Sequence, residues 1–213
     1  RRDQQRRAQR GMPTDHRPPE QFVVFTQNHD HVGNRAFGDR LPDGAQPLAA
    51  FCVLLSPFTP MLFQGEEYGE RAPFQFFSDH IDEEIATATR DGRLREFAAF
   101  ESFAGQVPDP QDPATFERSK LTREGVEGVR DLYARLLAAR ARLGRAETEA
   151  ADVDEDARTL RVRRAGHELA CNFAAEERRV PVRGSELVVA THDGVRLEGG
   201  DAVLPPLAGA LVA

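Results

Sequence analysis

The sequence is short of several residue types, and each shortage narrows what the protein can be. Cys52 and Cys171 are its only cysteines, and because both lie in apolar segments we expect free buried thiols in a reducing cytoplasm rather than a disulfide. No apolar run approaches the length of a membrane span, and no secretory leader is visible. The net charge of −7 argues against a nucleic-acid partner. We therefore expect a cytoplasmic protein that binds neither nucleic acid nor membrane.

The chain also has no methionine at its start. It opens with Arg1 and continues as a polar, arginine-rich stretch to Pro19. We expect it to begin inside a larger protein, with a trimmed or disordered tail as the alternative. Its 213 residues, 40% hydrophobic and 30% charged, have a soluble globular composition that allows one large domain or two small ones.

Two short apolar runs stand out in the first third of the chain. Residues 22–25 and 61–63 are predicted to be buried strands, and polar residues follow each of them at once. The apolar run 47–55 between them is predicted to be a helix, with Pro47 in its first turn. This order indicates a βαβ unit and a parallel sheet, in which ligands bind at the carboxyl ends of the strands.

The rest of the sequence predicts helices first and then short strands. We expect helices over 78–100, with Ser78 as the N-cap, and over 122–143, which Gly144 ends. The strands that follow predict a small antiparallel β domain. The expected loops are 33–44, 107–116 and the acidic linker 146–156, and the expected strands are 159–163, 167–173, 178–182, 186–190, 195–197 and 202–204.

The densest polar cluster follows the first predicted strand, where residues 27–31 read Gln-Asn-His-Asp-His. Two amides, an imidazole and a carboxylate in succession fit a polyol- or sugar-binding site. They also allow a metal site, since strand alternation would put His29 and His31 on one side. The remaining histidines are scattered through other segments, which disfavours a metal. In a third interpretation, Asp30 and Asn34 only cap the turn and His29 bonds a backbone group.

Residues 25–30, Phe-Thr-Gln-Asn-His-Asp, resemble the seventh-strand motif of the α-amylase-like glycoside hydrolases. The longer run 27–41 resembles one trehalose-releasing subgroup of that family, in which we expect Gln where this chain has His31. The resemblance covers about residues 20–143, and the order of its motifs makes it more specific than the first motif alone. The further motifs that carry it are the runs 60–67, 72–80, 92–97 and 107–113.

This resemblance implies a fold and an activity. The fold would be α/β: residues 1–145 would form the C-terminal part of a TIM (β/α)8 barrel, strands 7 and 8 with their helices, and residues 146–213 a small antiparallel β-sandwich domain. The activity would be hydrolysis of the α-1,4-glucosidic bond next to the trehalose end of maltooligosyl trehalose, which releases trehalose and a shortened maltooligosaccharide. No cofactor and no catalytic metal are implied.

The resemblance also implies roles for individual residues. Asp30 matches the carboxylate that stabilises the transition state, and His29 matches the sugar-binding histidine beside it. The family's nucleophile and general acid lie at the ends of strands four and five, before this sequence begins, so we expect a C-terminal fragment that is inactive by itself. The remaining candidates are Asn28, Gln27 and Arg35 for substrate binding and Glu67 as a supporting residue behind them.

Two other functions fit the residues. One is a related α-glucan hydrolase or branching enzyme, and the other is a non-catalytic carbohydrate-binding fragment. Sugar-binding β modules present aromatic platforms, whereas this chain has no Trp and only two Tyr. We therefore expect residues 159–213 to pack against the barrel rather than to bind sugar.

Overall fold

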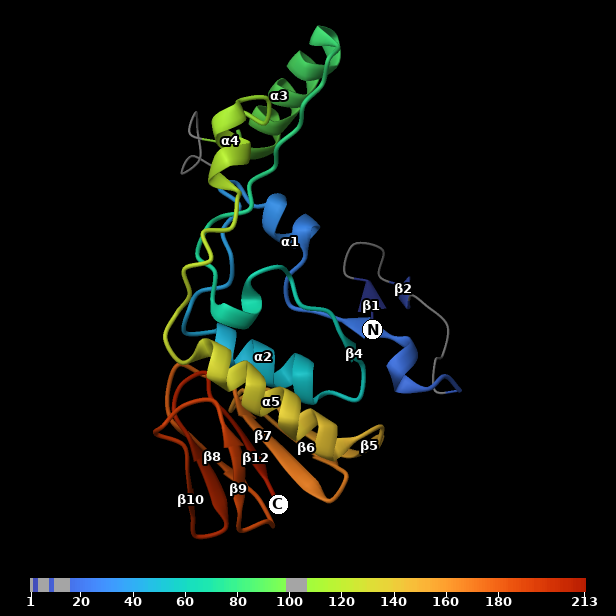
Figure 1. Ribbon diagram of the computed structural model, residues 1–213. Coiled ribbons are helices and arrows are strands. Elements are labelled where there is room, and N and C mark those ends of the chain that lie inside the picture. The colour runs from blue at the N-terminus through green and yellow to red at the C-terminus, as the bar shows by residue number, and fades with distance from the viewer. Residues whose placement is uncertain (1, 4–7, 10–15, 99–106) are drawn as a thin grey trace.

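The computed structural model describes residues 2–3, 8–9, 16–98 and 107–213 (Figure 1). The residues between these ranges, which include the predicted helix end at 99–100 and much of the arginine-rich start, lie outside the described part. The elements in chain order are β1 (Arg2–Asp3), β2 (Ala8–Gln9), a 3-10 helix (Pro19–Gln21), β3 (Val23–Val24), α1 (His29–Gly33), α2 (Gln46–Leu55), β4 (Thr59–Pro60), a second 3-10 helix (Glu66–Tyr68), α3 (Glu83–Phe97), α4 (Pro113–Arg118), α5 (Val129–Leu143), β5 (Thr148–Asp154), β6 (Thr159–Arg164), β7 (His167–Asn172), β8 (Arg178–Pro181), β9 (Leu187–Ala190), β10 (Arg196–Glu198), β11 (Asp201–Leu204) and β12 (Gly209–Val212).

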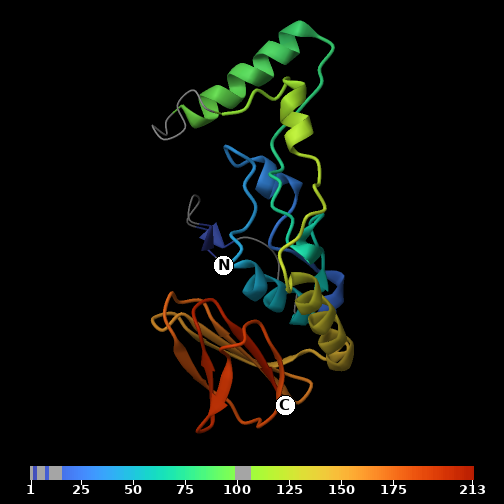
Figure 2. The same cartoon turned by 60° about the vertical axis from the view of Figure 1, so that its left-hand side comes forward.

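These elements form three tiers, which both ribbon views show (Figures 1 and 2). A β-sandwich makes up one end, and α2, α5 and the β3–β4 pair lie in the middle. Helices α3 and α4 project from the other end, with α1 between them and the middle tier. None of the helices in the described ranges combines the length and the apolar character needed to cross a bilayer.

The middle tier contains the predicted parallel strands in a shorter form. β3 pairs with β4 in parallel, with Val23 opposite Thr59 and Val24 opposite Pro60, which confirms the predicted parallel pairing. The second strand lies just before the predicted range 61–63. The prediction that the first strand is buried on both faces is wrong for Val23, which is 56% exposed. Within the described residues, β3 has β4 as its only neighbouring strand, so little of the sheet covers it.

Helices α2 and α5 pack on each other and on one face of the larger sheet. Phe51 and Leu54 of α2, Leu136 of α5 and Leu211 of β12 are fully buried in this core. The predicted end of α5 is confirmed, since Gly144 follows it with a φ of 58° and donates its N–H to the Arg140 carbonyl. This core joins the middle tier to the β-sandwich.

The β-sandwich has two antiparallel sheets, one in the order β5-β6-β7-β12-β9 and one in the order β10-β11-β8. Neighbouring residues of its central strands point to opposite faces. Leu169 and Leu211 pack toward α2 and α5, whereas Ala170 and Ala210 pack toward the smaller sheet. The predicted antiparallel strands are thus confirmed, but the sequence pattern missed β12, which lies between β7 and β9.

The predicted acidic linker 146–156 is wrong, because most of it is strand β5. Asp152 of β5 forms an ion pair with Arg161 of β6, with Oδ2 and Nη2 2.7 Å apart. Opposite charges on paired strands stabilise a sheet. The acidic residues that suggested a loop therefore belong to a strand, and they face arginines on the neighbouring strand β6.

Helix α2 makes two close contacts with the β-sandwich, one at Gly209 and one at the two cysteines. Gly209 of β12 lies against the Phe51 ring, and a Cβ added to it would be 2.9 Å from that ring. The thiols of Cys52 on α2 and Cys171 on β7 are free, with their sulfur atoms 3.9 Å apart. Cys171 is buried and Cys52 is half-buried, so residues 119 positions apart in the chain meet at this interface.

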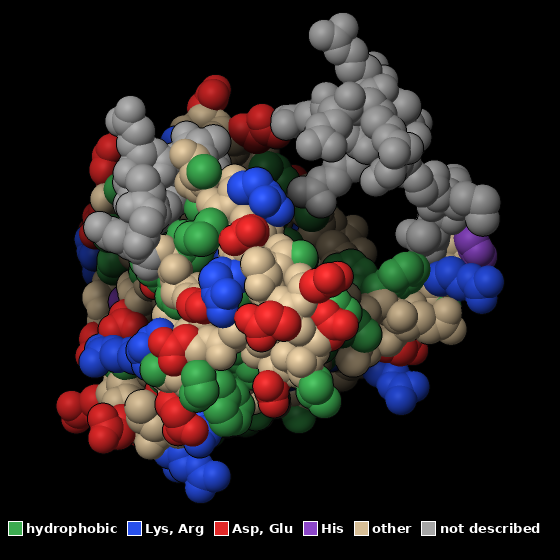
Figure 3. Space-filling view, turned by 90° about the horizontal axis from the view of Figure 1, so that it is seen from above, with side chains coloured by type: hydrophobic (Ala, Val, Ile, Leu, Met, Phe, Trp, Pro, Cys, Tyr) green, Lys and Arg blue, Asp and Glu red, His purple; other side chains and the backbone are tan. Residues whose placement is uncertain are grey.

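The projecting end differs from the sequence prediction at two helix starts. Asp82, not Ser78, caps α3 and accepts hydrogen bonds from the N–H groups of Glu84 and Ile85. The Ser78 hydroxyl instead accepts the side-chain amide of Gln111. Within the predicted loop 107–116, Asp112 caps the short helix α4. Seen from above, the molecule presents acidic, basic and hydrophobic side chains interspersed with one another (Figure 3).

A buried arginine attaches this end to the rest of the molecule. Arg93 of α3 is 6% exposed, and its Nη2 donates to the carbonyls of Gly33 at 2.8 Å and Arg35 at 2.7 Å. Its guanidinium also lies over the rings of Phe76 and Phe97. α3 is therefore fixed to the carboxyl end of α1.

Candidate active site

The predicted polar cluster lies where β3 ends, and there the chain turns into the short helix α1. Asn28 is the N-cap, with an extended backbone and a side-chain Oδ1 that accepts the His31 N–H at 2.7 Å. The expectation that His29 and His31 share one side is wrong because both lie on helix α1. Residues two positions apart on a helix point in directions that differ by about 200° around its axis. Within the described ranges no three His, Cys, Asp or Glu side chains gather in a way that could hold a metal.

His29 and Asp30, on the first turn of α1, form an exposed pair. The His29 Nε2 and the Asp30 Oδ1 are 3.2 Å apart, and the two side chains are 71% and 67% exposed. An exposed pair of this kind adds little to stability. It leaves an imidazole and a carboxylate side by side and open to solvent, beyond the carboxyl end of a parallel strand, which is where ligands bind in parallel α/β folds.

Gln27 lies beneath this pair rather than beside it. Its side chain is 2% exposed, and its Nε2 donates to the Glu66 Oε1 at 2.7 Å while its Oε1 accepts the Leu41 N–H at 2.6 Å. Both polar ends of the amide are therefore engaged by the protein. This arrangement favours a role in holding the strand end and the loop before Leu41, rather than contact with a ligand.

Glu66 is the residue that sequence reasoning missed. It is 4% exposed, and besides Gln27 its carboxylate accepts the Phe63 N–H at 3.0 Å. Burial raises the pKa of Glu66, and the hydrogen bonds from Gln27 and Phe63 oppose that shift. The neighbouring Glu67, the predicted supporting residue, is exposed, and its side chain has no hydrogen bond within the described chain. The Glu-Glu sequence after a buried strand was the available signal, but it did not say which of the two turns inward.

Arg35 and Arg40 organise the loop that follows α1. Arg35 Nη1 donates to the carbonyls of Asp39 and Arg40 from an exposed position. Arg40 donates to the Ala72 carbonyl at 2.7 Å and lies over the Phe63 ring, 5.0 Å from its centre. Of the predicted residues, Asn28, His29, Asp30 and Arg35 thus come together on or next to α1. Gln27 is buried and is hydrogen-bonded to Glu66, which the sequence did not single out.

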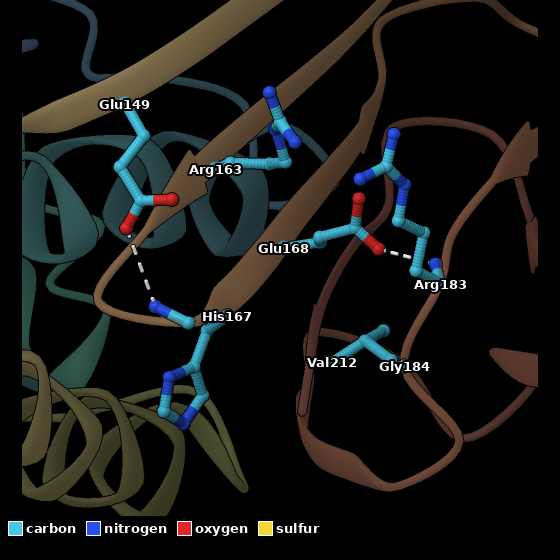
Figure 4. A pocket seen from close by; sticks show the side chains of 8 residues that line it. Glu149, Arg163, His167, Glu168, Arg183, Gly184 and Val212 are labelled. Atoms are coloured by element: carbon cyan, nitrogen blue, oxygen red, sulfur yellow. Dashed lines mark hydrogen bonds between the residues drawn. The ribbon is translucent and has the colours of Figure 1, made fainter.

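A cavity of about 300 Å³ lies in the β-sandwich (Figure 4). Glu168 is at its buried floor and accepts the backbone N–H of Arg183. Arg163 and Glu149 also line it, and Glu149 reaches the Gly166 N–H at 3.4 Å. Among its described lining residues, His167 is the only one with an aromatic ring.

Comparison with known proteins adds to this geometry. No family model matches the chain. Malto-oligosyltrehalose trehalohydrolases of Rhizobium sp. (strain M-11) and Brevibacterium helvolum are 46% and 42% identical to it over 209 residues, in each case 91% of this chain. A Salmonella typhimurium protein of known structure, assigned as an alpha amylase, matches with a TM-score of 0.78 and 31% identity, over 100% of this chain and 39% of its own.

A short parallel strand that is followed, four residues after its end, by Asn-His-Asp at the start of a helix, together with the Salmonella likeness, defines the class as the α-amylase-like glycoside hydrolases. Within that class, the chain belongs to the malto-oligosyltrehalose trehalohydrolase family. It spans about 35% of the length of those two relatives.

Proposed function

We propose that this chain forms part of an enzyme that hydrolyses the α-1,4-glucosidic bond next to the trehalose end of maltooligosyl trehalose. The observation that carries the proposal is the exposed His29–Asp30 pair directly after a parallel strand, in a chain 46% identical to a named trehalohydrolase. On this proposal β3 and β4 are strands 7 and 8 of a TIM (β/α)8 barrel. Residues 1–145 then belong to the barrel, residues 146–213 form a second domain, and the enzyme is cytoplasmic.

The geometry of α1 supports a division of roles. Positive charge develops on the sugar ring as a glycosidic bond breaks, and a carboxylate beside the ring stabilises that charge. Asp30 supplies this carboxylate and accepts hydrogen bonds from sugar hydroxyls. His29 donates to a neighbouring hydroxyl, while Asn28 fixes the first turn that carries both side chains.

Retaining glycosidases also need a nucleophile and a general acid, with carboxyl groups about 5–5.5 Å apart. Within the described residues, the only side chain at ion-pair distance from Asp30 is His29. We therefore assign Asp30 to stabilising the transition state alone. The nucleophile and the acid would come from polypeptide other than these 213 residues.

Asp30→Asn in a whole enzyme that contains this chain tests the proposal. Removing one preorganised electrostatic group is expected to lower kcat about 10²- to 10³-fold with a smaller change in KM. Trehalose release from maltooligosyl trehalose is the measurement, and the 213-residue chain by itself is expected to release none. Asp131→Asn, at an exposed position of α5, is the matched control and should keep full activity.

Two results would contradict the proposal. Full activity of Asp30→Asn would remove Asp30 from the chemistry. Cleavage of maltooligosaccharides without release of trehalose would instead favour another α-glucan hydrolase or a branching enzyme, consistent with the 31% identity to the Salmonella protein.

A further inference from the structure

A cavity of about 420 Å³ lies in the projecting end, away from the His29–Asp30 pair. It is lined by the segment before α3 and by the segment that leads into α4. Ser78 joins these two walls, because its N–H donates to the Pro110 carbonyl at 2.8 Å and its Oγ accepts the Gln111 side-chain amide at 2.7 Å. The cavity is thus built by direct contacts between the two segments.

Two aromatic rings form the apolar part of this cavity. The rings of Phe77 and Phe116 meet edge to face with centres 5.1 Å apart. Phe116 remains 44% exposed, although Lys120 lies over its ring, with Nζ 4.8 Å from the ring centre. An exposed ring at the mouth of a cavity offers an apolar surface to the C–H face of a sugar ring.

The polar part of the lining consists of acceptors. Asp79 makes no hydrogen bond or ion pair within the described chain, and Asp112 uses only its Oδ1, on the Ala114 N–H. An ionised carboxylate can only accept hydrogen bonds, so the free oxygens suit a ligand that donates several. The lining residues include no cationic side chain, and the nearby Lys120 is paired with Glu117 at 2.6 Å, which disfavours a phosphate or another anion. The chemistry that fits is a neutral, hydroxyl-rich molecule.

A row of aromatic rings connects this cavity with the middle tier. Phe63, just after β4, meets Phe74 with ring centres 5.3 Å apart, and Phe74 meets Phe77 at 5.7 Å. Gly33 of α1 also lies against Phe74, since a Cβ added there would be 3.8 Å from its ring. The row therefore runs past the helix of the candidate active site to the cavity wall.

From this arrangement we propose that the cavity binds a segment of the α-1,4-glucan chain, beyond the sugar units held at Asp30. Its volume suits about one or two sugar rings. Phe116 packs against a ring face, and Asp79 and Asp112 accept its hydroxyls. The inference rests on the proposed function, because it assigns a second contact for the same substrate.

Titration of the 213-residue chain with maltohexaose by calorimetry tests this directly. Phe116→Ala is expected to raise the dissociation constant about tenfold, because one aromatic contact contributes about a factor of ten to the affinity. Phe173→Ala is the matched control, because Phe173 is similarly exposed, at 42%, but lies in the β-sandwich. Asp79→Asn should also weaken binding, and Asp79 has no contact in the described chain whose loss would unfold the protein.

The outcomes separate this inference from the proposed function. Binding that Phe116→Ala leaves unchanged while Asp30→Asn weakens it would overturn the cavity assignment and keep the proposed activity. No binding of maltohexaose, or equal binding of cellohexaose, would also overturn it. In the whole enzyme, Phe116→Ala is expected to raise KM for long substrates only and to leave kcat unchanged, whereas loss of activity on short substrates would contradict the inference.

Discussion

At the scale of single residues, Glu70 is more strongly held than any carboxylate of the candidate site. It accepts hydrogen bonds from the N–H groups of Ala72 and Arg123 and from the Thr122 hydroxyl, at 2.8 to 3.0 Å. Burial alone would raise the pKa of Glu70, but these hydrogen bonds outweigh it and hold the pKa at about 2. Glu70 thus joins the segment after β4 to the segment before α5.

Glu70→Gln is expected to remove a pH-dependent part of the stability. The native pKa of about 2 lies below the ordinary 4.5, so the unfolded chain takes up the proton first as the pH falls. The stabilisation is complete above about pH 4.5 and is lost as the pH falls toward 2. Urea unfolding across this range should show the wild-type protein losing more stability than Glu70→Gln. Glu67→Gln, at the exposed neighbouring position, should behave as the wild type, and equal pH slopes for all three proteins would contradict the prediction.

The residues of the candidate site were predictable to different degrees. Asn28, His29 and Asp30 are consecutive, so the sequence alone brought them together. Gln27 and Glu66 are 39 positions apart, and their hydrogen bond depends on how β3 and β4 pair. The inward turn of Glu66 could therefore not be read from its own neighbours.

At the scale of elements, the carboxyl end of helix α2 is bonded by two arginines, the half-buried Arg140 and the buried Arg164. Arg140 donates to the carbonyls of Leu54 and Ser56, and Arg164 donates to the carbonyl of Leu55. Arg164 also donates to the carbonyl of Gly144, just after α5, at 2.7 Å. Carbonyls at the carboxyl end of a helix have no hydrogen-bond donor within the helix and carry partial negative charge. A guanidinium supplies both the missing N–H donors and a positive charge.

Arg164→Met is expected to lower the free energy of unfolding by about 3 kcal/mol, because it leaves buried carbonyls without donors. Arg164 is 1% exposed, so water cannot replace the guanidinium easily. Arg163→Met is the matched control: Arg163 is the neighbouring residue of β6, and its side chain makes no hydrogen bond within the described chain. Chemical denaturation measures both variants, and equal losses for the two would refute the capping role.

Elements with regular patterns were predictable, and those that depend on partners were not. The strands from 159 to 204 and the end of α5 follow from alternation and from Gly144. β5 was missed because its acidic residues are stabilised by the arginines of β6. The start of α3 was misplaced because Ser78 bonds across to Pro110, a contact that no local pattern records.

At the scale of the whole molecule, the β-sandwich and the helical tier depend on one close approach. Gly209→Ala would place a methyl group 2.9 Å from the fully buried Phe51 ring. We expect a loss of about 1–3 kcal/mol in the free energy of unfolding, the usual effect of overpacking a core. Gly44→Ala is the control, since nothing lies within 4 Å of a Cβ there. Urea unfolding of both variants checks this, and a neutral Gly209→Ala would mean that the tiers can separate freely.

The attachment of α3 to α1 by Arg93 has a consequence for how distant parts of the molecule affect each other. Because the guanidinium bonds the carbonyls of Gly33 and Arg35, the projecting end cannot shift without straining the helix that carries Asp30. Such coupling is reciprocal by thermodynamic necessity. Any ligand that steadies the far end would steady Asp30, and a ligand held at Asp30 would strengthen binding at the far end by the same factor.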